Sequence, residues 1–197
     1  MNQGGEAGQG GSDECAGGTI IASTSSPLGL AIPDDGYDGS LASMTCRDVV
    51  VSCGGPVSDL SVTLAITHSW VGDLTIKLRS PNATIVTLLN RPGTDAPDDG
   101  TSGPGESSSL LSTSPITFSD GAPSAAETMG DTIKDAGVVC RDDAACSFVP
   151  SPDTAAGGLL STLDGQELLG TWQLCVADGS LGDTGVLDGV QLRLGDE

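Results

Sequence analysis

The residues best suited to chemistry surround one short turn, His68-Ser-Trp-Val-Gly-Asp73, which holds the only histidine of the chain. An imidazole beside a carboxylate and a serine could form the triad of a hydrolase. A triad also needs a nucleophile on a strained turn and an oxyanion hole. The chain has no G-x-S-x-G motif, and His68 and Asp73 stand at the two ends of one turn. We therefore predict no catalytic residue, and expect His68, Trp70 and Gly72 to shape the turn.

Carboxylates in Gly- and Pro-rich loops suggest a second chemistry, the binding of calcium. This ion takes roughly six to eight oxygen ligands, usually carboxylates, backbone carbonyls and water. Carboxylates at the ends of different strands can meet at one rim of a β-sandwich, so we predict a calcium site there. The candidate ligands are Asp34, Asp35, Asp73, Asp120, Asp178 and Asp183. The alternative is that these acidic loops are only solvated, because acidic residues are mostly exposed.

The overall charge limits the partners. The 197 residues include 27 acidic and 7 basic side chains, which gives a net charge of −20. Such a chain is repelled by nucleic acid and by anionic membranes. It also contains no apolar stretch long enough to span a bilayer. We therefore expect no nucleic-acid partner and no membrane insertion.

The six cysteines indicate disulfides. No pair has C-x-x-C spacing, and an even number in an acidic, Ser/Thr-rich chain is typical of an oxidising compartment. We expect a secreted or cell-surface protein whose signal peptide is not in this chain. Cys140 and Cys146 form the best local pair. Cys46 and Cys53 flank an extended segment that would separate them by about 23 Å, which disfavours that pair. The pairing of the others stays open: Cys15, Cys46, Cys53 and Cys175.

The elements that position these groups are strands. Val62, Leu64 and Ile66 alternate with polar residues before the turn, and a similar alternation follows at 74–79. A period of two indicates strands with one buried face, so we predict a β-hairpin over 61–81. Trp172 alternates with Leu174 and Val176 in the same way and should be buried.

The whole pattern predicts an all-β chain. We expect about eight strands with long irregular loops, arranged as an antiparallel two-sheet β-sandwich of jelly-roll type. Residues 1–18 are rich in Gly, Gln and Ser and are predicted to be a disordered linker or stalk. Residues 19–197 are predicted to form the sandwich domain.

Several motifs occur in an order that resembles a known family. The series includes Ile32-Pro-Asp34, Val57-Ser-Asp-Leu60, Ile66-Thr-His-Ser-Trp-Val-Gly-Asp-Leu74, Leu78-Arg-Ser-Pro-Asn82, Thr87-Leu-Leu-Asn-Arg-Pro-Gly93, Thr117-Phe-Ser-Asp120 and Gly170-Thr-Trp-Gln-Leu-Cys-Val-Ala-Asp178. Over roughly residues 31–195, the chain resembles the P domain, or Homo B domain, of the subtilisin-like proprotein convertases of the kexin and furin group and their bacterial relatives.

The resemblance implies an eight-stranded jelly roll that follows a protease domain, packs against it and supports its folding and stability. Several members bind calcium. It implies a secreted, non-catalytic, calcium-stabilised module that folds with, stabilises or regulates a subtilisin-like serine endopeptidase in cis or in trans. The alternative is a free-standing surface, adhesion or ligand-binding jelly roll without a protease. Carbohydrate binding is disfavoured because few aromatics could form a platform: Tyr37, Trp70, Phe118 and Phe148.

Overall fold

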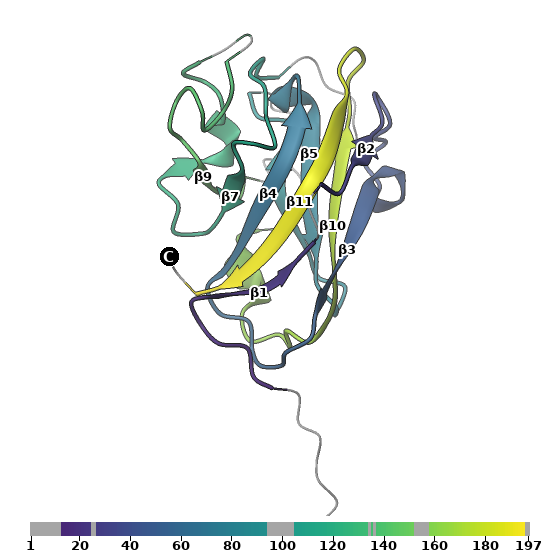
Figure 1. Ribbon diagram of the computed structural model, residues 1–197. Helices are drawn as coiled ribbons and strands as arrows, with labels where there is room; N and C mark the ends of the chain where they lie inside the picture. The colour runs from purple at the N-terminus through teal and green to yellow at the C-terminus, as the bar shows by residue number, and fades with distance from the viewer. Residues whose placement is uncertain are drawn as a thin grey trace, which may run out of the picture.

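The strands form two sheets that pack face to face, as the computed structural model shows (Figure 1). The structure describes residues 13–24, 27–93, 105–133, 135, 137–151 and 158–195. The larger sheet has the order β1 (Thr19–Ser23), β11 (Gly185–Leu194), β4 (Leu60–His68), β7 (Ile116–Phe118), β9 (Ser147–Val149) and β8 (Ser124–Ala125), with β2 (Leu30–Ile32) also paired to β11. The smaller sheet has the order β3 (Thr45–Val51), β10 (Gly170–Asp178), β5 (Leu74–Arg79) and β6 (Ile85–Asn90).

The all-β sandwich is confirmed, but the predicted number of strands is wrong. The described part of the chain contains eleven strands, not eight, and four short 3-10 helices: η1 (Leu41–Ser43), η2 (Val71–Asp73), η3 (Ala126–Thr128) and η4 (Leu160–Leu163). Several of the additional strands have only two or three residues, too few to show a period of two. Pairing is antiparallel except where β9 meets β7 and β8. The jelly-roll connectivity stays a prediction.

The core lies between the two sheets and follows the predicted alternation. Val62, Leu64 and Ile66 on β4 are buried. Trp172 on β10 is fully buried as predicted, and its indole N–H donates to the carbonyl of Leu168 at 2.9 Å. The inward faces of β5 and β11 complete this core.

The predicted hairpin over 61–81 is wrong. β4 pairs with β11 and β7 in the larger sheet, whereas β5 pairs with β10 and β6 in the smaller one. The turn that contains η2 therefore carries the chain from one sheet to the other. The alternation of apolar residues showed which face of each strand is buried, but it contains no information about the pairing partner.

The smaller sheet is covered on its outer face as well. Tyr37 and Met44 pack with Cys175 and Ala177 in a second apolar cluster. Lys77 is buried on the same face, with its Nζ 5.6 Å from the centre of the Tyr37 ring. This layer explains why β5 is buried on both faces, which the sequence did not predict.

Three disulfides join the described parts of the chain. Cys140 bonds to Cys146, the local pair that the sequence favours. Cys46 bonds to Cys175 directly opposite it across β3 and β10. Cys15 bonds to Cys53, so residues 13–18 of the predicted stalk are attached to the sandwich. The rest of that segment, 1–12, lies outside the described residues. No helix in the described ranges is long and apolar enough to cross a membrane.

Candidate functional site

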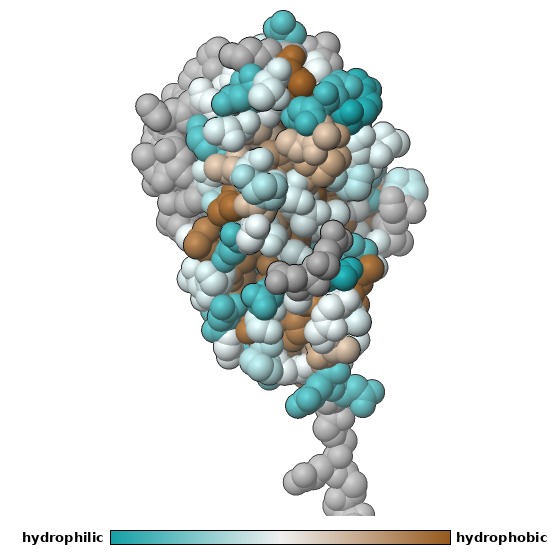
Figure 2. Space-filling model, turned by 90° about the vertical axis from the view of Figure 1, so that its left-hand side faces the viewer, coloured by the Kyte–Doolittle hydropathy of each residue, from teal (hydrophilic) through white to brown (hydrophobic). Residues whose placement is uncertain are grey.

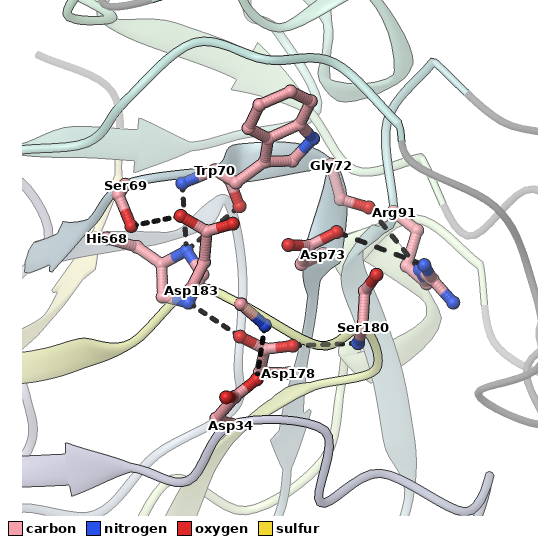
Figure 3. A network of polar contacts seen from close by, with 11 residues as sticks. Asp34, His68, Ser69, Trp70, Gly72, Asp73, Arg91, Asp178, Ser180 and Asp183 are labelled. Carbon is pink, nitrogen blue, oxygen red and sulfur yellow. Dashed lines mark hydrogen bonds and ion pairs between the residues drawn. The ribbon is translucent and has the colours of Figure 1, made fainter.

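A buried polar cluster lies at the end of the sandwich where β4 and β10 finish (Figure 3). His68 and Asp178 are the last residues of these two strands. The other members come from loops and turns: Asp34 after β2, Asp73 in η2, Arg91 after β6 and Asp183 between β10 and β11. His68, Asp73, Arg91 and Asp178 are buried. The fold therefore gathers one cation and several carboxylates from segments far apart in sequence.

The ring of His68 is held at both nitrogens. Nε2 lies 3.0 Å from Oδ2 of Asp178. Nδ1 lies 2.9 Å from the carbonyl oxygen of Trp70 and 3.2 Å from its amide nitrogen. The neighbouring Ser69 hydroxyl donates to Asp183 and not to the imidazole. Because the ring is buried and both nitrogens are engaged, His68 has no position from which to activate a nucleophile.

Carboxylates of this cluster also hold the loop between β10 and β11. Asp178 Oδ1 accepts a hydrogen bond from the amide of Ser180 at 2.8 Å. Asp34 Oδ1 accepts one from the amide of Gly182 at 3.0 Å. With Asp183 bound to the Ser69 hydroxyl, the loop is fastened to both β2 and the turn after β4. These side chains thus have a structural role in orienting three connections.

Asp73 is the exception, because its Oδ1 is buried and accepts no hydrogen bond in the described part of the structure. The nearest opposite charge is the Arg91 guanidinium, with Nη2 4.0 Å from that oxygen. Burial raises the pKa of Asp73 to about 6; the charge of Asp178 raises this pKa further, while Arg91 opposes the shift. Asp73 is therefore a carboxylate that changes charge within the mildly acidic range.

Arg91 is the residue that the sequence analysis did not single out. Its Nε donates to the carbonyl of Gly72 at 3.3 Å, and the side chain is fully buried. It also has a left-handed backbone conformation, with φ at 49°. The available signal was an arginine directly before a proline in a chain with only 7 basic residues. Nothing in the sequence placed it beside Asp73.

Asp120 and Asp35 do not join the cluster as predicted. Asp120 accepts hydrogen bonds from the amides of Leu160 and Ser161, both at 2.8 Å. It shares a small pocket with Leu60 at the start of β4. The cluster lies at the other end of that nine-residue strand, about 26 Å away at the usual rise per residue. Asp35 is exposed, with φ at 50°. The candidate Asp120 therefore does not share a rim with the carboxylates of the cluster.

A known protein family matches part of the chain. Residues 57–111 match the proprotein convertase P-domain. The match includes β4, η2, β5 and β6, and with them His68, Asp73 and Arg91. A P-domain is a non-catalytic accessory domain of subtilases.

Two solved structures are similar to the chain at low identity. One is the crystal structure of a serine protease of Aeromonas sobria, with 17% identity and a TM-score of 0.43 over 84% of this chain and 24% of that one. The other is the complex of the Aeromonas sobria serine protease with its chaperone, with 18% identity and a TM-score of 0.43 over 85% and 25%. The chain thus spans about a quarter of the length of these proteins. The curated proteins gave no match.

The calcium expected of a P-domain can be tested against the oxygens present in the cluster. Asp34, Asp178 and Asp183 each accept hydrogen bonds from groups of the protein itself. Asp73 has a free oxygen, but the Arg91 guanidinium lies beside it. Among the residues described, no three acidic, histidine or cysteine side chains are gathered so that they could hold a metal ion. The cluster as arranged therefore does not fit a calcium ion.

Proposed function

We propose that this chain is a secreted, non-catalytic P-domain module that folds with, stabilises or regulates a subtilisin-like serine endopeptidase domain in cis or in trans. The observation that carries the proposal is the P-domain match over residues 57–111. Three disulfides support an oxidising, extracellular location. The buried ring of His68, engaged at both nitrogens, supports a module without catalysis of its own.

The surface supports a partner held by mixed polar and apolar contacts. On the face drawn in Figure 2, hydrophobic residues form separate patches between hydrophilic ones. The large exposed hydrophobic residues of the described chain are spread over strands and connecting segments: Ile20 on β1, Val50 on β3, and Leu159, Leu169 and Leu181 in connections. Interfaces between proteins that also exist separately are about as polar as the rest of the surface. A protease domain bound to this surface would therefore form an interface like those between proteins that also exist separately, and not the more apolar interface of an obligate complex.

The test is co-expression of this module with the subtilisin-like protease domains of its source genome. We expect at least one protease domain to co-purify with the module, and its melting temperature to rise when the module is present. An unrelated disulfide-bonded β-sandwich is the control. If no protease domain binds or changes its stability, the free-standing surface, adhesion or ligand-binding module is the better interpretation.

Calcium stabilisation is a separate part of the proposal, supported by the acidic loops and the resemblance but not by the geometry of the buried cluster. The domain would be treated with EDTA and titrated with calcium in a calorimeter. Heat of binding together with a raised melting temperature would support calcium stabilisation. Absence of heat at millimolar calcium would exclude it without affecting the protease proposal.

A further inference from the structure

A polar groove of about 430 Å³ lies on the outer face of the larger sheet. Asp59 and Ser61 line it at the end of β4 opposite His68. The loop Gly121-Ala-Pro123 forms one wall. Its volume falls within the range of roughly 300–1,000 Å³ that is typical of ligand sites. Neither the buried cluster nor the proposed association with a protease assigns a role to it.

The floor of the groove consists of side chains in two rows across the strands. In one row Gln191, Thr63, Thr117 and Ser147 are successive cross-strand neighbours on β11, β4, β7 and β9. The Thr63 and Thr117 hydroxyls are 2.9 Å apart and hydrogen-bonded.

In the other row, Arg193 lies directly opposite Ser61. The two rows are two residues apart along β4, or about 7 Å. The distance between the two rows equals the distance between alternate residues of an extended peptide. The hydroxyl and amide groups of the floor could therefore contact every second residue of such a peptide.

Arg193 is the group that points to a ligand. Its Nε is buried and has no hydrogen-bond partner among the described residues. Within the same ranges its guanidinium makes no ion pair or hydrogen bond, although the chain carries 27 acidic side chains. Nε itself has no accessible surface, so a ligand would contact the terminal nitrogens of the guanidinium, which are not among the buried unpaired atoms of the described residues. A carboxylate matches the planar guanidinium best, because it can accept two parallel hydrogen bonds.

We propose that this groove binds an extended peptide segment of a partner protein, with a carboxylate side chain of that segment on Arg193. Three observations select this ligand class. The hydroxyls and the Gln191 amide suit the alternating donors and acceptors of a peptide backbone. None of the described residues that line the groove is aromatic, so they give a sugar ring no surface on which to stack. The net charge of −20 repels a polyanion far more strongly than a segment with a single carboxylate.

The experiment compares two peptide arrays probed with the labelled domain. Both contain random octapeptides; one has a fixed central Asp and the other a fixed central Asn. We expect the Asp array to bind more strongly by about tenfold, the effect of one charge-assisted hydrogen-bonded pair. Arg193→Gln should abolish this preference. Thr63→Val should weaken binding to both arrays, because it removes a hydroxyl of the floor without changing its shape.

Arg47→Gln is the matched control, because Arg47 is an exposed arginine on β3 of the other sheet. This variant should keep the preference for Asp. Arg193→Gln should also keep the melting temperature of the wild type, since Arg193 has no partner to lose in the described structure. Equal binding to the two arrays, or an Asp preference that survives Arg193→Gln, would overturn the proposal. So would binding to an oligosaccharide array that Arg193→Gln removes.

Discussion

Removal of the Cys46–Cys175 disulfide should destabilise the domain far more than removal of the Cys140–Cys146 disulfide. The first bond joins two paired strands of the smaller sheet across 129 residues of sequence. The second closes a loop of only 6 residues. A disulfide stabilises the fold mainly by restricting the unfolded chain, and a longer loop gives a larger restriction.

The two loop lengths give the expected magnitudes. In the chain-entropy relation, a separation of 129 residues corresponds to about 5 kcal/mol and a separation of 6 to about 2 kcal/mol. For a domain of this size, 1 kcal/mol changes the melting temperature by about 2–4 °C. Cys46→Ala/Cys175→Ala should therefore lower it by about 10–20 °C, and Cys140→Ala/Cys146→Ala by about 4–9 °C.

The assay is thermal unfolding followed by circular dichroism without reductant, with thiol titration to show that the other two disulfides remain intact. Cys175 is fully buried beneath Tyr37 and Met44, so packing lost at that site adds to the larger effect. Equal losses in the two double variants, or a larger loss for Cys140→Ala/Cys146→Ala, would refute the reasoning from loop length.

Two further predictions concern the turn between the sheets. Asp73 keeps its proton in the folded state up to a pH of about 6, whereas its ordinary pKa is 3.8. Between these two pH values the folded state binds more protons than the unfolded state. The free energy of unfolding should therefore fall as pH rises from about 4 to about 6. Urea unfolding at several pH values should show that Asp73→Asn flattens this decline, and an unchanged slope would contradict the assignment. A Cβ on Gly72 would collide with the backbone of Gly105 and Glu106, so Gly72→Ala should cost about 1–3 kcal/mol. Gly36→Ala, whose Cβ would have only ordinary contacts, is the control in the same unfolding assay, and similar losses in both variants would count against the collision.

The strands could be predicted wherever one face is buried over several residues. The alternation in β4 and β10 identified both strands and the burial of Trp172. It could not show that β4 and β5 belong to different sheets, because alternation defines a buried face and not a partner. The short strands β8 and β9 escaped prediction, because two or three residues carry no period.

The sequence identified several residues of the candidate site but not how the fold places them relative to one another. The turn from His68 to Asp73 and the acid at Asp178 were identified from sequence, and the structure brings them together. Asp120 was grouped with them because it also follows a strand, but β7 places it at the opposite end of β4. Arg91 was missed because its contact with Asp73 depends on how β6 returns to the turn.

The class of fold, the presence of disulfides and the lack of a catalytic motif could be read from the sequence alone, since each depends on composition or on local periodicity. The three-dimensional fold was needed to show which carboxylates meet, which cysteines pair over long distances and that Arg193 Nε has no hydrogen-bond partner among the described residues. The physical reason is that these contacts join segments separated by many residues, and their positions follow from strand pairing between sheets. The turn around His68 shows the difference: its residues suggested chemistry, and the fold made it a buried connection between two sheets.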